Sequence, residues 1–192
     1  MLHDPWLERW MPLLMERAGT GTVLEIGCGH GDDTITLTAA GLRVKAFDLS
    51  RASVAIAKLR APAASIEQRD IRDPFPLAKG QAAAVIASLS LHYFRWQDTL
   101  AIVERIRHVL QPGGLVLCRL NSTEDRHFGA SGHQEIERNY YSVDGEPKRF
   151  FDEDSTRTLF SQGWRVKSLE HFVTRKYVKT KALWEIALEK AE

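Results

Sequence analysis

The chain has 192 residues, 44% of them hydrophobic, with 26 Lys and Arg against 25 Asp and Glu. This length and apolar content suit one sizeable core and are short for two. The near balance of charge argues against a dedicated nucleic-acid surface or an acidic tail, and two cysteines exclude a disulfide scaffold.

The N-terminus lacks a basic region followed by an apolar core, and no apolar run approaches the length of a membrane span. Cys28 and Cys118 both lie in apolar strand contexts, where a free cysteine behaves as a small hydrophobe. The sequence therefore favours a soluble cytoplasmic protein without a membrane partner, either a monomer or a homodimer.

The first predicted element is a helix with Asp4 as its N-cap, Pro5 in its first turn and Gly19 at its end. Trp6 and Trp10 fall on one face of this helix. The two tryptophans are read as core between helix and sheet, and a lid over a binding site is the alternative.

Apolar strands then alternate with amphipathic helices, which predicts βαβ units and a doubly wound, mostly parallel α/β sheet. The predicted strands are Thr22–Ile26, Arg43–Phe47, Ser65–Gln68, Ala82–Ser88 and Leu115–Leu120. The predicted helices are Asp32–Ala40, Arg51–Arg60 and Trp96–Leu110.

The pattern changes after Leu120. Residues 121–149 are polar and irregular, which predicts a functional loop or short helices of its own. A helix over Phe151–Phe160 follows. Trp164–Val173 and Lys179–Glu189 are two consecutive strands without a crossover helix between them, so they are expected to pair antiparallel.

The most informative stretch runs from Val23 to Gly31 (VLEIGCGHG), an apolar strand that opens into alternating glycines. Gly27, Gly29 and Gly31 allow a sharp turn and a close approach to a ligand. An acidic first helical turn follows. Strand, glycine turn and helix together predict an adenosine-containing cofactor at the carboxyl edge of a parallel sheet.

Two carboxylates are expected at the same edge. Asp48 ends the second strand, 21 residues after Gly27, where an acidic side chain reaches ribose hydroxyls; capping the helix that starts near Ser50 is its alternative role. Asp70 ends the third strand and can accept from the adenine amine, or can serve only as a turn residue. Ile71 and Leu49 offer the ring polar and apolar contacts.

The glycine spacing discriminates between cofactors. Gly27-x-Gly29-x-Gly31 is one residue shorter than the G-x-G-x-x-G of dinucleotide sites. Glu25 adds a carboxylate near the turn, which is a poor neighbour for pyrophosphate and a good one for an ammonium or sulfonium group.

Taken together, these motifs, with Leu110-Gln111-Pro112-Gly113-Gly114-Leu115 before the fifth strand, resemble the class I S-adenosylmethionine (SAM)-dependent methyltransferases over roughly residues 20–120. The resemblance implies SAM as cofactor and S-adenosylhomocysteine (SAH) as product. It implies a cofactor site formed by Glu25, Gly27, Cys28, Gly29, Gly31, Asp48, Leu49, Asp70, Ile71 and Ser88.

We expect one domain over 1–192. Its parts are an N-terminal helical cap (1–19), a cofactor-binding core (20–120), a substrate-side insertion (121–151), and a helix with a terminal hairpin (152–192).

The segment Ser88–Phe94 follows the fourth strand, where such enzymes hold the methyl-bearing end. Enzymes that methylate amino groups on nucleobases resemble one another in carrying an Asn or Asp followed by Pro-Pro and an aromatic residue at this place. The segment lacks that motif. A small-molecule acceptor (a thiol, a metalloid oxyanion, or an O or N nucleophile) is therefore favoured. Asn139-Tyr140-Tyr141 and Lys148-Arg149-Phe150-Phe151 are similar to small bacterial methyltransferases of the tellurite-resistance (TehB-like) type.

A sulfonium is an excellent leaving group, so catalysis is mostly alignment of the acceptor, worth ~7–11 kcal/mol. His92, His133 and, after them, Tyr140 are candidate bases for a hydroxyl acceptor. Each histidine also has a non-catalytic alternative, as a rim residue or a solvated loop residue. Arg149 can pair an anionic acceptor bidentately, or bind only a backbone carbonyl or Asp152.

His133, Glu135 and Glu137 do not match the spacing of hydrolytic zinc motifs, and no metal is expected. Three other functions remain open. They are an RNA or protein methyltransferase docking through the basic C-terminal hairpin, a non-catalytic SAM-binding module, and an NAD-dependent oxidoreductase.

Overall fold

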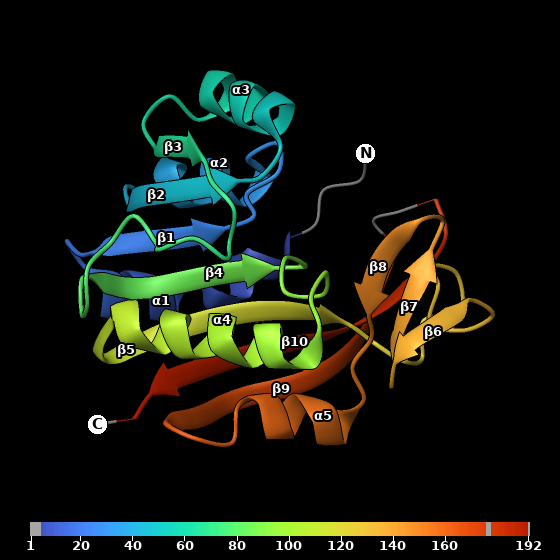
Figure 1. The fold of residues 1–192 in the computed structure, drawn as a ribbon. Helices are drawn as coiled ribbons and strands as arrows, with labels where there is room; N and C mark the ends of the chain where they lie inside the picture. Colours follow the sequence, from blue (N-terminus) through green and yellow to red (C-terminus); the bar gives the residue numbers. More distant parts are fainter. Residues whose placement is uncertain (1–4, 176–177, 192) are drawn as a thin grey trace.

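The computed structural model describes residues 5–175 and 178–191, in which a seven-stranded sheet has the order β3-β2-β1-β4-β5-β10-β9 (Figure 1). Its strands are β1 (Thr22–Ile26), β2 (Arg43–Asp48), β3 (Ser65–Gln68), β4 (Ala82–Ser88), β5 (Leu110–Asn121), β9 (Trp164–Thr174) and β10 (Lys181–Lys190). The five neighbouring strands β3, β2, β1, β4 and β5 are parallel to one another. Strand β10 pairs antiparallel with both β5 and β9, so the predicted doubly wound sheet with an antiparallel end is confirmed.

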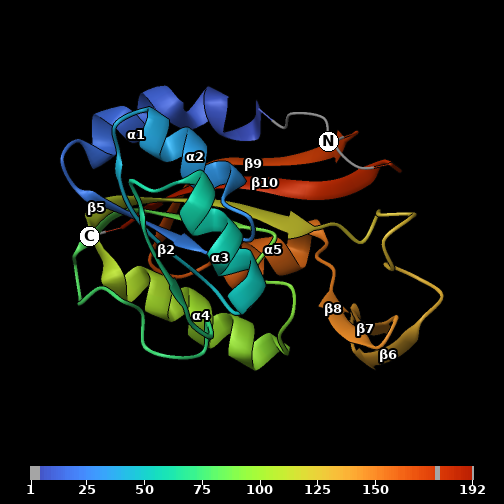
Figure 2. The same cartoon turned by 90° about the horizontal axis from the view of Figure 1, so that it is seen from above.

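Helices cover both faces of this sheet (Figure 2). They are a 3-10 helix (Pro5–Trp10), α1 (Met11–Ala18), α2 (Asp32–Ala39), α3 (Arg51–Arg60), α4 (Trp96–Val109) and α5 (Glu153–Leu159). On one face of the sheet, the 3-10 helix, α1, α2 and α3 contribute to one buried apolar cluster. On the other face, α4 and α5 contribute to a second apolar cluster. Because β1 and β4 are buried on both faces, their carboxyl ends are held rigidly where a ligand would bind.

The N-terminal segment differs from the single helix expected. A 3-10 helix runs to Trp10 and an α-helix then runs to Ala18, with Gly19 as its C-cap at φ 49°. Asp4, the predicted N-cap, lies outside the described residues. Trp6 is buried against the sheet, as the core interpretation predicts.

Strand β5 begins at Leu110, five residues before the predicted start. Its pairing with β4 jumps from Ala82↔Leu110 to Ala84↔Leu115, so the intervening residues bulge out of the ladder. The glycines of this segment permit the bulge, and Gly113 has φ 70°.

The insertion after β5 contains strands and not the short helices that the sequence analysis gave as one alternative. It contains a three-stranded antiparallel sheet of β6 (Gln134–Glu137), β7 (Tyr140–Val143) and β8 (Glu146–Arg149). Asp144 (φ 53°) and Gly145 (φ 84°) form the left-handed turn that joins β7 to β8. Figure 1 shows this small sheet beside the carboxyl ends of the parallel strands.

Helix α5 is shorter than predicted. Asp152 is its N-cap, with its carboxylate accepting from the Ser155 N–H at 2.7 Å. The preceding Phe151 instead bridges to Ser122, and its carbonyl accepts from the Trp184 indole at 2.8 Å. These contacts fasten the insertion to β5 and β10.

Within 5–175 and 178–191, no helix has the length and apolar character needed to cross a bilayer.

Candidate active site

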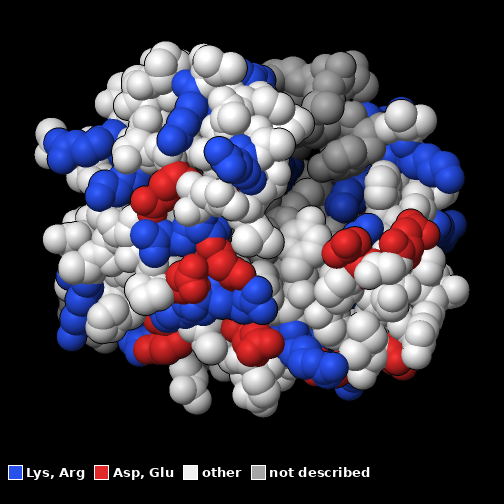
Figure 3. Space-filling view, turned by 45° about the horizontal axis from the view of Figure 1, so that its top comes forward, with Lys and Arg blue, Asp and Glu red and all other residues white. Residues whose placement is uncertain are grey.

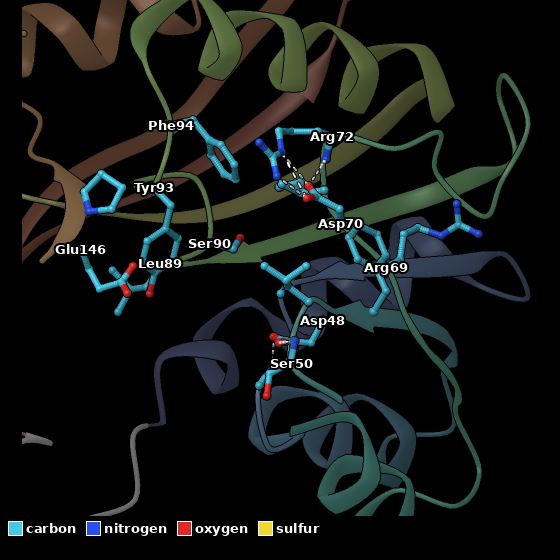
Figure 4. Close-up of a pocket in the computed structure, with 16 residues that line it drawn as sticks. Asp48, Ser50, Arg69, Asp70, Arg72, Leu89, Ser90, Tyr93, Phe94 and Glu146 are labelled. Carbon is cyan, nitrogen blue, oxygen red and sulfur yellow. Dashed lines mark hydrogen bonds and ion pairs between the residues drawn. The ribbon is translucent and has the colours of Figure 1, made fainter. Parts of the chain in front are cut away.

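A cavity of about 560 Å³ opens at the carboxyl edge of the sheet, between the loops that follow β1, β2, β3 and β4 (Figure 4). Such a volume lies within the range of small-ligand sites. Its lining includes the predicted residues Gly27, Gly29, Asp48, Leu49, Asp70 and Ile71. The tips of the first three strands therefore converge, as the sequence predicted.

The glycine turn brings the β1 loop against the loop after β4. Gly27, Gly29 and Gly31 have φ of 70°, 53° and 82°, in the left-handed region that side chains rarely adopt. A Cβ on Gly27 would lie 2.6 Å from the Cβ of Ser90. Only glycine allows the backbone to pass this closely, so the turn can present its amides to a ligand.

Asp48 fixes the two neighbouring loops to each other. Its carboxylate accepts from the Gly29 N–H at 2.9 Å and from the Ser50 N–H at 2.8 Å. Ser50, whose hydroxyl accepts from the Ser53 N–H, is the N-cap of α3, so the capping role considered for Asp48 is wrong. A carboxylate has about four acceptor positions, which leaves capacity for ribose hydroxyls.

Asp70 lies across the cavity from Asp48 and is paired with Arg72. Its carboxylate accepts from the Arg72 N–H at 2.8 Å and from the guanidinium at 2.5 Å (Figure 4). These hydrogen bonds hold the pKa of Asp70 below its usual range. Its carbonyl also closes a turn with the Asp73 N–H, so the turn role is present beside the predicted one. Leu49, which is 64% exposed, and Ile71, which is buried, both line the cavity. Contact with an adenine ring stays a prediction for them.

A second, smaller cavity of about 230 Å³ shares Gly27, Gly29 and Leu89 with the lining of the first. Its lining includes Glu25, Cys28 and Ser88. Contact with the methionine and methyl-bearing end of the cofactor stays a prediction for these residues. Glu25 is buried and accepts from the Thr34 hydroxyl at 2.6 Å. Burial, followed by the charge of Asp33, raises the pKa of Glu25 well above its usual value. A bound cation would reverse that shift, because it favours the ionised carboxylate.

Cys28 is not a nucleophile in this setting. Burial raises the pKa of its thiol to about 12, so the thiolate is scarce near neutral pH. Its contribution is the surface it presents to the second cavity.

The wall of the second cavity includes Asp33 and Arg119, which the sequence did not single out, and Trp6 contacts both of them. The Trp6 indole donates to Asp33 at 2.9 Å, and the Arg119 guanidinium lies 4.4 Å from the Trp6 ring. Arg119 also donates to the Ser88 hydroxyl at 2.9 Å. The N-terminal 3-10 helix thus supports the cofactor site as well as the core. In the sequence, only the pair of Trp6 and Trp10 indicated this role. Their contacts with Asp33 and Arg119 could not be predicted, because those contacts depend on the register of the sheet.

The structure brings three of the four candidate catalytic residues together, because the Arg149 N–H donates to the His92 carbonyl at 2.6 Å and the Arg149 guanidinium lies 4.7 Å from the Tyr140 ring. His92 is buried in the loop after β4, and His133 is exposed before β6. Neither lines the two cavities. Tyr140 donates from its hydroxyl to the Tyr93 carbonyl at 2.9 Å. Their catalytic roles stay predictions.

Arg149 is buried within the insertion. It pairs with Glu137 at 2.5 Å, donates to the carbonyls of Phe94 and Arg138, and lies over the Tyr140 ring. These contacts match the alternative in which Arg149 binds backbone carbonyls, although its carboxylate partner is Glu137 and not Asp152. Binding an acceptor stays a prediction for this side chain.

The larger cavity is also lined by residues that were not among the predicted site residues. Ser90, Arg69 and Arg72 line it from the strand tips, and Glu146 and Pro147 line it from β8. Tyr93 and Phe94 line it too, whereas Trp96 lines a separate hollow with Arg149.

No set of three His, Cys, Asp or Glu side chains in the described ranges is grouped so that it could hold a metal ion. Of the residues compared with zinc motifs in the sequence, Glu137 accepts hydrogen bonds from Arg95 and Arg149, and Glu135 accepts from the Asn139 N–H.

Comparison with known proteins agrees with this geometry. Residues 23–114 match the family model of a methyltransferase domain. Over 93 residues the chain is 30% identical to an uncharacterised methyltransferase of Synechocystis, sll0829, covering 48% of this chain and 43% of that protein. The chain spans less than half the length of the first two curated relatives it matches.

Solved structures share the fold along nearly the whole chain. A SAM-dependent methyltransferase of Methanosarcina mazei has a TM-score of 0.78 at 14% identity, with 94% of this chain and 97% of that chain covered. Magnesium protoporphyrin IX methyltransferase of Synechocystis, solved with bound SAM, has a TM-score of 0.67 at 14% identity, with 96% and 78% covered. The finer resemblance to the tellurite-resistance type stays a prediction.

Proposed function

We propose that this chain, whose residues 23–114 match the family model of a methyltransferase domain, transfers the methyl group of SAM to a small-molecule acceptor. One observation carries the proposal. The two acidic strand tips, Asp48 and Asp70, line one cavity, and the buried carboxylate of Glu25 lines a second that shares the glycine turn with it.

The chemistry of the lining fits SAM in each part. Asp48 has capacity for ribose hydroxyls, and Asp70 with Ile71 and Leu49 suits an adenine ring. Glu25 and Ser88 lie at the opposite end, where an ammonium and a sulfonium would lie. Bound SAM supplies an activated methyl group on a positively charged sulfur.

The chain's own residues would align the acceptor and exclude water. Glu146 and Pro147 of β8 reach the cavity, so the small sheet forms one wall next to Tyr93 and Phe94. Such a wall narrows the acceptor space, which favours a small molecule over a polymer. In-line positioning of this kind supplies a large share of the rate enhancement.

Charge argues in the same direction. Figure 3 shows Lys and Arg interspersed with Asp and Glu on the face it presents. In the C-terminal hairpin, Arg165 and Lys167 both pair with Glu189. Among the residues drawn in colour, the face in Figure 3 shows no basic stripe of the kind that an RNA would need. The proposal includes a cytoplasmic location, because Cys28 and Cys118 are unpaired buried thiols, as a reducing compartment favours.

The test is turnover of SAM to SAH by the purified protein with thiols, selenite, tellurite and phenols as acceptors. Production of SAH and of a methylated acceptor by the wild type, absent in Asp48→Ala, is the expected result. If the protein binds SAM but methylates none of these acceptors, it is instead a SAM-binding module.

A further inference from the structure

Ser90, in the loop that follows β4, has a buried hydroxyl without a hydrogen-bond partner among the described residues. The residue is only 8% exposed, and it lines the larger cavity. Because buried polar atoms are nearly always paired, an unpaired hydroxyl in a cavity wall indicates a site built for a polar ligand. Two other atoms of this kind in the described part of the chain, His92 Nδ1 and Asn121 Oδ1, belong to residues that line neither cavity.

The residue before Ser90 has a strained backbone. Leu89 has φ 55°, in the left-handed region that residues other than glycine rarely adopt. Its N–H donates to the carbonyl of Arg119 on β5 at 2.9 Å, so the neighbouring strand holds this conformation in place. Strained backbone of this kind is concentrated at ligand sites. The strain and the unpaired hydroxyl thus occur at adjacent residues of one cavity wall.

Ser90 lies on the side of the cofactor site from which an acceptor would approach. After β4, Ser88 lines the second cavity, Leu89 lines both cavities and Ser90 lines the larger one. A SAM molecule that extends from Asp48 in the larger cavity to Glu25 in the second passes Leu89 at its middle, where its sulfur is. An acceptor that reaches the methyl group through the larger cavity therefore meets Ser90.

The larger cavity also offers apolar surface to an acceptor. Leu89, Phe94 and Pro147 are among its lining residues. In the view of Figure 4, Ser90 lies between Leu89 on one side and Asp70 on the other. Apolar walls with a few placed polar groups are typical of small-molecule sites. This wall suits a small molecule with an apolar body and one polar atom at Ser90.

The small sheet fixes the loop that carries this hydroxyl. The Arg149 N–H donates to the His92 carbonyl at 2.6 Å, and Arg149 Nε donates to the Phe94 carbonyl at 3.1 Å. The Tyr140 hydroxyl donates to the Tyr93 carbonyl at 2.9 Å. A loop held in this way by its neighbours loses little freedom when a ligand binds, so its hydroxyl is preorganised.

We propose that Ser90 binds the methyl acceptor. Its hydroxyl oxygen accepts a hydrogen bond from the O–H or N–H of a small acceptor in the larger cavity, which turns a lone pair of that oxygen or nitrogen toward the methyl group. The inference rests on the proposed function and adds the class of acceptor atom to it. An S–H group is a weak donor, so a thiol would use this hydroxyl poorly.

Methyl transfer to such an atom needs only SAM, the acceptor and water. A lone pair of the oxygen or nitrogen forms the bond to the methyl carbon, and the carbon–sulfur bond breaks with its electron pair going to sulfur. The acceptor loses its O–H or N–H proton to water, and neutral SAH and the methylated acceptor remain.

The first test compares two acceptors of matched shape, phenol and thiophenol, in the wild type and in Ser90→Ala, with aniline as the nitrogen acceptor. Loss of the hydroxyl is expected to lower kcat/KM about tenfold for phenol and aniline and by less than about twofold for thiophenol, with SAH affinity unchanged in calorimetry. Ser65→Ala is the control, because Ser65 is exposed at the start of β3, at the opposite edge of the sheet.

Thermal melting of the protein without ligand is the second measurement. Replacing an unpaired buried hydroxyl removes its desolvation cost, so Ser90→Ala is expected to melt at the wild-type temperature or above it. Ser155→Ala is the matched comparison. The Ser155 hydroxyl accepts from the Asp152 N–H at 3.0 Å, so its loss is expected to lower the melting temperature.

If Ser90→Ala loses melting temperature as Ser155→Ala does, the hydroxyl has a partner within the protein and the inference is overturned. It is also overturned if the variant loses SAH affinity about tenfold, if the variant methylates phenol and aniline like the wild type, or if the wild type binds SAH and methylates neither of them. The methyltransferase proposal stands in all of these cases, because thiols, selenite and tellurite test it separately. If SAH itself fails to bind, the proposed function fails first.

Discussion

The backbone N–H of Gly29 donates to the carboxylate of Asp48 across 2.9 Å, joining the loops that follow β1 and β2. The other oxygen of that carboxylate accepts from the Ser50 N–H at 2.8 Å. One side chain therefore sets the distance between the glycine turn and the start of α3. The same carboxylate faces the cavity, so the position of the turn and the contacts to a ribose depend on a single residue.

Replacing Asp48 should impair cofactor binding more than folding. We expect Asp48→Ala to weaken SAH binding ~10²-fold or more, because hydrogen bonds to charged groups are worth ~1.5–3 kcal/mol each and two ribose hydroxyls lose their acceptor. Calorimetry measures the dissociation constant. Asp154→Ala is the control, since Asp154 is exposed on α5, and wild-type affinity in Asp48→Ala would remove Asp48 from the site.

Replacing Glu25 by Gln should stabilise the empty protein at pH 8 and weaken its binding of SAH. Its folded pKa is raised, so between the ordinary value and the raised value the folded protein holds more protons than the unfolded chain. The stability of the empty protein therefore falls as pH rises through that window. Glu25→Gln keeps an acceptor for Thr34 and should melt at a higher temperature than the wild type at pH 8, but not at pH 4.

The same variant should bind SAH about tenfold more weakly, because the ammonium group loses its charged partner. Melting curves from pH 4 to 8, with calorimetry at pH 7.5, measure both effects. Unchanged stability at pH 8 together with unchanged affinity would contradict the role given to Glu25.

Asp70 should discriminate the base of the cofactor. A carboxylate accepts from the exocyclic amine of adenine and repels the carbonyl that replaces it in hypoxanthine. The wild type is therefore expected to prefer SAH over S-inosylhomocysteine by about tenfold or more, and Asp70→Ala should narrow that preference. Competition binding of the two compounds measures the ratio. Equal preference in wild type and variant would place the base elsewhere.

His92 should make stability depend on pH. Burial depresses its pKa in the folded protein, so the unfolded chain takes up a proton near pH ~6.5 while the folded protein does not. Stability from this group is present above that pH and is lost as pH falls from 7.5 to 5.5. His92→Gln should flatten the fall in melting temperature over this range.

His133→Gln is the control for that measurement, because His133 is exposed before β6. Neither substitution is expected to change SAH affinity. A loss of affinity in His92→Gln comparable with that of Asp48→Ala would make His92 a cofactor-binding residue.

The parallel half of the fold could be predicted almost residue by residue. β1, β3, β4 and α3 have the predicted bounds, because buried strands and helices of this kind carry dense apolar periodicity and are separated by turn residues. The antiparallel end followed from the missing crossover helix. The edge where Asp48 and Asp70 meet followed from the rule that parallel strands end on one side.

The insertion could not be placed in the same way. Its strands are four residues long and half exposed, so their periodicity is weak. The Asp144-Gly145 pair was the available signal, because such a pair favours a tight hairpin. The contact between β8 and the loop after β4, in which the Arg149 N–H donates to the His92 carbonyl at 2.6 Å, arises only in the tertiary fold.

The most direct measurement is a calorimetric titration of the purified wild-type protein with SAH, run beside an identical titration with NADH. The account predicts one SAH bound per chain with a micromolar dissociation constant and no saturable heat from NADH. Absence of SAH binding at millimolar concentration, or NADH binding with equal affinity, would contradict the assignment of this edge of the sheet to an activated-methyl donor.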